Sequence, residues 1–215
     1  MAVAQRVYGQ YCGFARALET IGERWALMIV RDLMVGPKRF SDLQRGLVGI
    51  PSNILTARLK EMEQSGIVRR RLLPRPAGSV VYELTSDGLE LESAVYALGR
   101  WGAKRLGDPR DYETVTPDSL VMALRTTFQP KAAKGVNVSY EFRAGDVVWY
   151  AKVKGGKLEA EPGPLPDADA VIEGGPILRP LMAREITPGE ALKSGAVKVR
   201  GRKELLDLFV ELFRI

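Results

Sequence analysis

The segment between residues 23 and 35 constrains the fold more than any other, because it is apolar almost all round a helix. Its apolar side chains are Trp25, Ala26, Leu27, Met28, Ile29, Val30, Leu33 and Met34. A helix that is apolar on every side must be enclosed by other elements, so it belongs at the centre of a domain. Gly36-Pro37 ends it, because glycine tolerates left-handed backbone and proline cannot continue a helix. We therefore predict a domain of helices packed around residues 23–35.

Shorter helices are predicted on either side of this segment. One opens at Ala15–Leu18 and runs towards Gly22. Ser41, with Gln44 three residues later, has the spacing of a capping box. That spacing predicts a short helix that starts at Ser41 and stops by Gly46.

A third helix is predicted from Ser52 to Gly66, with one apolar and one polar face. Leu55, Leu59 and Met62 fall at i, i+4 and i+7 and share the apolar face. The polar side carries Ser52, Asn53, Thr56, Ala57, Lys60 and Gln64. Asparagine can pair with adenine, the methyls of threonine and alanine can contact thymine, and lysine can reach guanine or phosphate. The helix N-terminus favours a phosphate oxygen. The alternative is a solvated polar face with no ligand.

A basic hairpin follows, with strands predicted at Ile67–Leu73 and Val80–Leu84 around a turn at 74–79. It carries four arginines, Arg69, Arg70, Arg71 and Arg75. Adjacent arginines in a strand cannot all face one way, so at least one is expected to pair with Glu83 or Glu61. Arg75 lies in the Pro-Arg-Pro tip, and such a stiff loop suits a narrow minor groove.

A long helix is then predicted from Thr85 or Ser86 to about Arg105. Its stripe of Leu91, Val95, Leu98 and Trp101 is too apolar to leave in water. We expect this stripe to be buried between subunits or against the first helix.

The order of these elements is that of a winged helix-turn-helix domain. The charge supports a polyanionic partner, because residues 1–107 hold 16 Lys+Arg against 10 Asp+Glu while residues 108–215 hold 16 of each. A solvated basic surface is the alternative. We predict double-stranded DNA as the partner. The candidate contacts are Arg39, Ser41, Ser52, Asn53, Thr56, Ala57, Arg58, Lys60 and Arg75.

Composition excludes several classes of site. The chain has no histidine, which removes Ser-His-Asp triads and His-containing zinc sites. The phosphate-binding and nucleophile motifs of common enzymes are also missing, although paired carboxylates or a lysine leave catalysis possible on paper. We expect no enzyme, no cofactor and no metal. The absence of a secretory start, the single cysteine and the short apolar runs predict a cytoplasmic protein without membrane contact.

Residues 12–107 resemble the HxlR family of bacterial winged-helix regulators. The segments that carry the resemblance are Cys12–Leu18, Ile21–Trp25, Arg31–Leu33, Gly36–Leu43, Leu55–Leu59, Tyr82–Thr85 and Gly99–Gly102. The resemblance implies a homodimer joined through the first helix and the helix after the wing, with DNA read by the helix from Ser52. It also gives Cys12 as a candidate redox residue. The alternative for Cys12 is a small buried core residue.

The second half is predicted to be α+β. A helix starts at Thr116-Pro117 and continues through Phe128, and strands follow at 136–142, 147–153, 157–160 and 170–172 as an antiparallel meander. Short helices at 177–184 and 189–193, a strand at 197–200 and a helix at 203–213 complete it. We place the domains at residues 1–107 and 117–215, joined by a linker at 108–116.

Residues 117–213 resemble the sterol-carrier-protein-type lipid-binding domain, less specifically. The segments are Val138–Phe142, Asp146–Tyr150, Gly156–Leu158, Pro166–Ile172 and Ala191–Val199. The resemblance implies helices on a mostly antiparallel sheet and an apolar pocket for a lipid-like effector. Candidate lining residues are Leu120, Leu124, Phe128, Trp149, Leu178, Leu181 and Met182. The alternative is a solid domain that only supports dimerisation.

Two functions from different classes fit these features. One is a DNA-binding regulator that senses an apolar small molecule, and the other is a lipid carrier or adaptor whose winged helix binds proteins. The four arginines of residues 69–75 favour the regulator, because an adaptor needs no basic wing.

Overall fold

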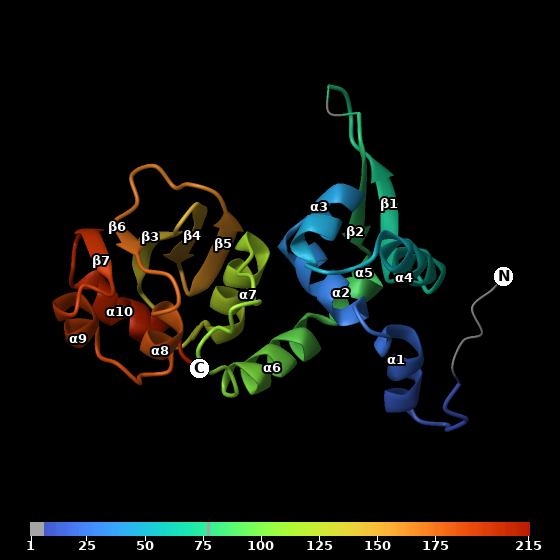
Figure 1. Ribbon diagram of the computed structural model, residues 1–215, viewed down its shortest axis with the longest axis horizontal. Helices are drawn as coiled ribbons and strands as arrows, with labels where there is room; N and C mark the ends of the chain where they lie inside the picture. Colours follow the sequence, from blue (N-terminus) through green and yellow to red (C-terminus); the bar gives the residue numbers. More distant parts are fainter. Residues whose placement is uncertain (1–6, 77) are drawn as a thin grey trace. The chain divides into compact units, whose positions relative to one another are not determined.

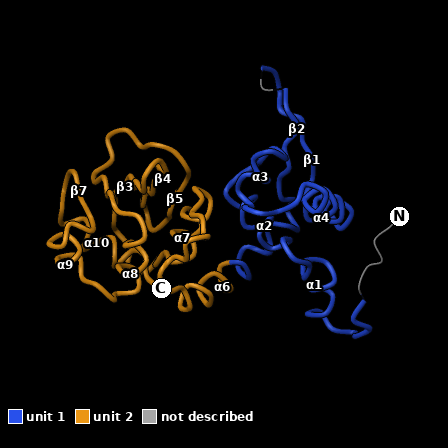
Figure 2. The backbone as a smooth tube through the Cα atoms, viewed as in Figure 1, with its two compact units in different colours: residues 1–95 blue, residues 96–215 orange. Residues whose placement is uncertain are grey.

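The chain divides into two compact units, residues 1–95 and 96–215 (Figure 2). The computed structural model describes residues 7–76 and 78–215. The division falls within the helix α6, Glu92–Ala103, whereas the sequence suggested a linker at 108–116.

The first unit has the element order of a winged helix-turn-helix domain, as predicted (Figure 1). Its elements are α1 Gly13–Ile21, α2 Ala26–Val35, α3 Phe40–Gly46, α4 Ser52–Gln64, β1 Val68–Leu72, β2 Val80–Leu84 and α5 Ser86–Glu90, followed by the start of α6. The strands β1 and β2 are antiparallel, with Arg70 opposite Tyr82, and they project from the helices as a wing.

The core of the first unit is built around α2, as its apolar sequence requires. Ile29, Val30 and Leu33 are buried. They join a cluster that includes Leu55, Leu59 and Met62 of α4. The predicted apolar face of α4 is therefore confirmed, and its burial determines which face of α4 looks outward.

Helix boundaries in this unit differ from the predictions at three starts, and α1 begins at Gly13, before the predicted Ala15. Trp25 has a left-handed backbone (φ 80°), so α2 begins only at Ala26. The helix α3 begins one residue before Ser41, and its capping carboxylate is Asp42, whose Oδ2 accepts the Arg39 backbone N–H at 3.1 Å. Gln44 therefore does not form the predicted capping box.

The predicted long helix is broken in two at Leu91. The Leu91 N–H donates to the Gly88 carbonyl three residues earlier, at 3.3 Å. Gly88 is packed so tightly that a Cβ would lie 2.2 Å from the Ile67 carbonyl oxygen. This close approach holds α5 against the base of the wing, while α6 starts afresh at Glu92.

The second unit is an α+β domain with a five-stranded sheet in the order β5-β4-β3-β6-β7. Its further elements are α7 Pro117–Thr127, β3 Asn137–Ala144, β4 Val147–Lys154, β5 Lys157–Pro162, β6 Ala170–Glu173, α8 Leu178–Met182, α9 Pro188–Lys193, β7 Lys198–Gly201 and α10 Leu205–Leu212. The strand β6 does not continue the meander. It pairs in parallel with β3, because residues 163–169 carry the chain across the sheet.

Stacked aromatic rings fill the core of the second unit. Tyr140, Phe142, Trp149, Phe209 and Phe213 are each 0–1% exposed. The rings of Phe142 and Trp149 stack with centroids 5.3 Å apart, and Phe142 lies 5.4 Å from Phe209 of α10. Tyr140 donates its hydroxyl to the Leu205 carbonyl at 3.0 Å, and burial raises its pKa. One face of the sheet is thus closed by α10.

Among the residues described, no helix combines the length and the hydropathy needed to cross a bilayer.

Candidate nucleic-acid interface

The outward face of α4 carries the polar side chains predicted for it. Ser52, Asn53, Thr56 and Lys60 are exposed, and Ala57 is half-buried. Thr56 donates its hydroxyl to the Ser52 carbonyl at 2.8 Å, so its hydrogen-bonding capacity is partly used within the helix. Pro51 precedes α4 without a side-chain cap, which leaves the first-turn N–H groups for an anion.

Arg58 lies on the inner side of α4, where it binds two carboxylates. Its side chain is 15% exposed and pairs with Glu23 at 3.2 Å and with Glu61. Glu23 stands between α1 and α2, so this pairing ties α4 to the segment that joins the two preceding helices. The geometry favours a positioning role for Arg58 over a direct DNA contact.

The helix α3 presents Arg39 and Ser41 at its exposed start. Asp42 is less available, because its carboxylate binds the Arg45 guanidinium at 2.6 Å as well as the Arg39 N–H. Burial raises the pKa of Asp42, but these hydrogen bonds outweigh it and the pKa is lowered overall. The carboxylate therefore stays charged and caps the helix.

The wing arginines divide into paired and unpaired side chains. Arg69 and Arg71 each donate Nε–H to Glu83 at 2.8 Å, which confirms the expected internal pairing. Arg70 points the other way and lies over the Tyr82 ring, 5.8 Å from its centroid. Within residues 7–76 and 78–215, Arg75 at the tip is exposed and has no carboxylate partner.

Glu83 of β2 is half-buried, and its carboxylate binds both Arg69 and Arg71 of β1. The hydrogen bond from Arg71 is the main cause that lowers its pKa, and Arg69 adds to it, while burial acts in the opposite direction. Two of the four wing cations are thereby neutralised in part. Among the described residues, Arg75 is left as an exposed wing cation without a carboxylate partner.

Two contacts at the base of the wing were not predicted. The Lys38 and Tyr82 backbones exchange hydrogen bonds of 2.9 and 2.7 Å, which adds a short third segment to the hairpin. Thr85 donates its hydroxyl to the Gly66 carbonyl at 2.5 Å. Both contacts fix where the wing leaves its unit, and neither has a sequence signal because each joins distant residues.

The stripe predicted for subunit contact is half-buried at one end and exposed at the other. Leu91 and Val95 pack on the core of the first unit. Leu98 and Trp101 are 52% and 59% exposed. On α1, Phe14 is 74% exposed, and Ala15 is the one buried residue of that helix.

Cys12 precedes α1 and is exposed, so the alternative of a small buried core residue is wrong for this chain. The backbone N–H groups of Ala15 and Phe14 lower the pKa of the Cys12 thiol, because they point towards the sulfur at the start of the helix.

The seven side chains predicted to line an apolar pocket lie in or beside the aromatic core of the second unit. Leu124, Trp149, Leu178, Leu181 and Met182 are buried, and Leu120 and Phe128 are half-buried. Phe128 contacts Phe213 with ring centroids 5.8 Å apart. A pocket of about 570 Å³ does open in this unit, but other residues line it.

Comparisons with known proteins find relatives for the part of the chain that holds the winged helix-turn-helix elements. The HxlR-like helix-turn-helix family model matches residues 20–109. The HTH-type transcriptional regulator YodB of Bacillus subtilis is 37% identical over 95 residues, 44% of this chain and 84% of YodB. The uncharacterized HTH-type transcriptional regulator YkvN of the same bacterium is 35% identical over 112 residues, 51% of this chain and 95% of YkvN. The solved reduced form of YodB has a TM-score of 0.40 and 35% identity, covering 47% of this chain and 100% of that one.

Proposed function

Because the chain belongs to the HxlR-like helix-turn-helix family, we propose that it is a bacterial transcription regulator that binds operator DNA through α4 and the wing. The observation that carries this proposal is the outward face of α4. Its apolar side is buried while Asn53, Thr56 and Lys60 are exposed beside an uncapped helix start. Such a helix can enter the major groove with its N-terminal half towards the bases.

Arg75 supports the second contact of the proposal. It is exposed at the end of a projecting hairpin, whereas Arg69 and Arg71 bind Glu83. A minor groove attracts an arginine because its electrostatic potential is the most negative on the duplex. Operator DNA lies in the bacterial cytoplasm, so we propose that location for the protein.

We propose a homodimer as the DNA-binding form. Phe14 on α1 and Leu98 and Trp101 on α6 are large, apolar and more than half exposed. Two reading helices related by a twofold axis require half-sites about one helical turn apart, so the operator should be nearly palindromic.

An apolar effector site among the seven predicted side chains stays a prediction. Their packing around stacked rings favours the alternative, a second unit filled by its own side chains. We propose no enzymatic role, because the relatives are named as transcriptional regulators.

The test is fluorescence anisotropy of the full chain on labelled DNA from upstream of its own gene, titrated at several salt concentrations. We expect a preference for one near-palindromic site, with affinity that falls steeply as salt rises because phosphate counterions are released. Equal affinity for a scrambled duplex at every salt concentration would refute specific binding. A monomer bound to a single half-site would refute the dimer alone.

A further inference from the structure

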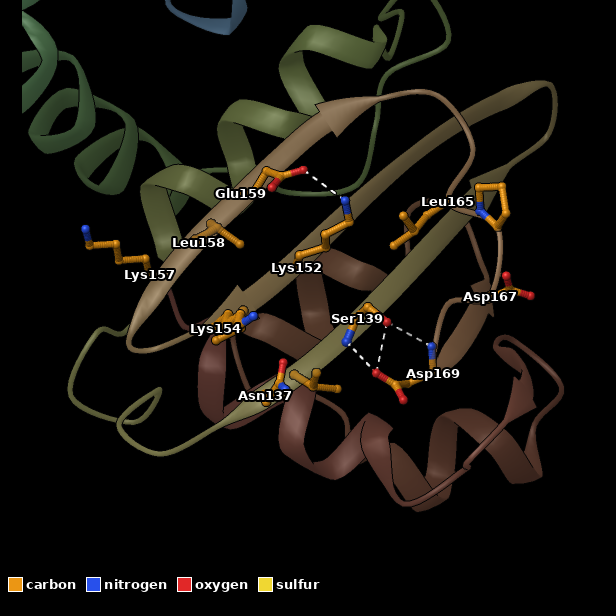
Figure 3. Close-up of a pocket in the computed structure, with 13 residues that line it drawn as sticks. Asn137, Ser139, Lys152, Lys154, Lys157, Leu158, Glu159, Leu165, Asp167 and Asp169 are labelled. Atoms are coloured by element: carbon orange, nitrogen blue, oxygen red, sulfur yellow. Dashed lines mark hydrogen bonds and ion pairs between the residues drawn. The ribbon is translucent and has the colours of Figure 1, made fainter.

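A pocket lies on the face of the sheet that the core aromatic side chains do not occupy (Figure 3). Strand alternation separates the two faces: Val138 and Tyr140 point into the core, whereas Asn137 and Ser139 point away from it. The pocket on this outer face has a volume of about 570 Å³, within the usual range of about 300–1,000 Å³ for small-molecule sites.

A tight turn places two lysines side by side at one end of the pocket. Gly155 and Gly156 have φ of 59° and 76°, a pair of left-handed residues that a two-residue hairpin of this kind requires. Lys154 and Lys157 are therefore direct partners across β4 and β5, and Asn137 lies opposite Lys154 on β3. Like charges directly opposite each other destabilise a sheet. An anion bound between them would relieve that repulsion.

The neighbouring cross-strand row, Ser139, Lys152 and Glu159, does not supply that anion. Lys152 lies opposite both Ser139 and Glu159. Glu159 accepts hydrogen bonds from the Tyr150 hydroxyl at 2.9 Å and from Lys152 at 3.1 Å, and these lower the pKa of Glu159. Its charge is thus already engaged. Among the described residues, no carboxylate pairs with Lys154 or Lys157.

An anchored loop forms an apolar wall along the pocket. The Leu165 N–H donates to Glu141 Oε2 at 2.7 Å, and Glu141 is only 3% exposed. At the other end of the loop, Asp169 accepts hydrogen bonds from the Ser139 N–H and hydroxyl, both at 2.9 Å. These bonds hold Leu165 beside the floor of the pocket (Figure 3), and the next residue, Pro166, also lines the pocket.

The charges of the pocket are arranged asymmetrically. Lys154 and Lys157 stand at the hairpin end, while the exposed carboxylate of Asp167 stands on the loop at the opposite side (Figure 3). The other acidic residue of the loop, Asp169, also binds Arg202 at 2.8 Å. An anionic ligand is therefore attracted to the hairpin end and repelled from the Asp167 side.

We propose that this pocket binds a small amphipathic organic anion, with its carboxylate or phosphate between Lys154 and Lys157 and its apolar part against Leu165 and Pro166. The site is distinct from the core positions considered for a lipid-like effector. It also stands independently of DNA binding, because every residue that forms it belongs to the second unit.

The test uses the full chain and the fluorescent probe 8-anilinonaphthalene-1-sulfonate, which joins an anion to an apolar ring system. Octanoate, octyl phosphate and neutral octanol then compete for the probe. We expect saturable probe binding and displacement by one or both anions, which also shows whether carboxylate or phosphate is preferred. Octanol should compete at least about tenfold less well, because it lacks the charge.

Paired variants locate the site. Lys154→Gln with Lys157→Gln should weaken probe binding about tenfold. The matched control, Lys193→Gln with Lys203→Gln, removes the same charge from exposed lysines of the same unit outside the pocket, and it should bind as the parent does. Leu165→Ser should weaken binding without changing net charge. The pocket pair is expected to fold, because it removes a like-charge contact, and circular dichroism checks this.

Three results would overturn the proposal: no saturable probe binding by the parent chain, octanol competing as well as octanoate and octyl phosphate, or equal loss in the pocket pair and the control pair. DNA binding is measured separately on the same variants. A failure of either measurement therefore leaves the other interpretable.

Discussion

Helices α1 and α10 have similar lengths and opposite surroundings. The nine residues of α1 include one buried side chain, Ala15, whereas α10 buries five of its eight residues. Both are rich in apolar residues, so the difference in burial depends on the packing surface available within their own unit. In the second unit, the apolar side chains of α10 pack on the aromatic core of the sheet. The first unit leaves Phe14 of α1 in water, which a stable protein avoids by adding another surface.

The largest effect is expected on the free energy of unfolding, from a substitution in the aromatic core of the second unit. Phe142→Ala should lower the free energy of unfolding of the second unit by about 3–5 kcal/mol, because Phe142 is fully buried against Trp149 and Phe209. Urea unfolding followed by hydrogen-exchange mass spectrometry reports each unit separately. Phe14→Ala is the control, and its effect should depend on protein concentration while that of Phe142→Ala should not. Equal, concentration-independent losses would contradict the contrast between the two helices.

The next largest effect is expected on self-association, through the exposed apolar side chains of α1 and α6. Phe14→Ser or Trp101→Ser should weaken self-association by about 2–4 kcal/mol, the range of central aromatic residues in interfaces. Light scattering across a dilution series measures it. Tyr112→Ser changes an aromatic residue that is 72% exposed outside both helices, and it should leave the dimer intact. If all three variants associate alike, α1 and α6 do not form the interface.

Within the first unit, substitutions in α4 and in the wing should change DNA binding in different ways. Asn53→Ala should relax the preference at one base pair by about 1–3 kcal/mol, because a base-edge contact is lost. Arg75→Ala should weaken binding to all sequences and reduce the salt slope by about 1, because a phosphate-neutralising or groove charge is lost. Gln64→Ala, exposed at the far end of α4, is the control. Competition titrations with single-base operator variants separate these outcomes, and a wing variant that changed base preference would reverse our assignment.

The smallest effect is expected from the paired part of the wing. The pKa of Glu83 is lowered in the folded chain, so its stabilising contribution is complete above the pKa of an unfolded glutamate and is lost as the pH falls through the folded pKa. Arg69 and Arg71 are 65% and 44% exposed, which limits the contribution to about 1 kcal/mol or less. Glu83→Gln should therefore flatten the acid side of the stability profile of the first unit slightly. A parent and a variant with the same profile between pH 7 and pH 3 would show that this pairing contributes nothing.

Much of the first unit followed from local pattern. The burial of Leu55, Leu59 and Met62 and the exposure of Asn53 and Lys60 were predictable, because one helix has only two faces to assign. The wing strands were also predictable, since turn residues separate two β-rich runs. The pairing of Arg58 with Glu23 was not, because it joins residues 35 positions apart that only packing brings together.

The second unit was less predictable for the same physical reason. Its helices and strands were found near their observed positions, yet β6 pairs in parallel with β3 and does not follow β5. The outer pocket was missed, because its floor is made by cross-strand neighbours from three strands and its wall by a loop that crosses them. Alternation along one strand cannot reveal which other strand lies beside it.

By itself, the sequence determined where helices and strands form, which faces are apolar, and that the basic excess lies in the first half, because these properties depend on neighbours within a few residues or on composition alone. The tertiary structure decided that Trp25 adopts a left-handed backbone, that Arg69 and Arg71 are bound to Glu83 while Arg75 is exposed, and that Lys154 and Lys157 face one pocket. Each of these depends on the free energy of contacts between distant segments, which exist only once the chain has folded.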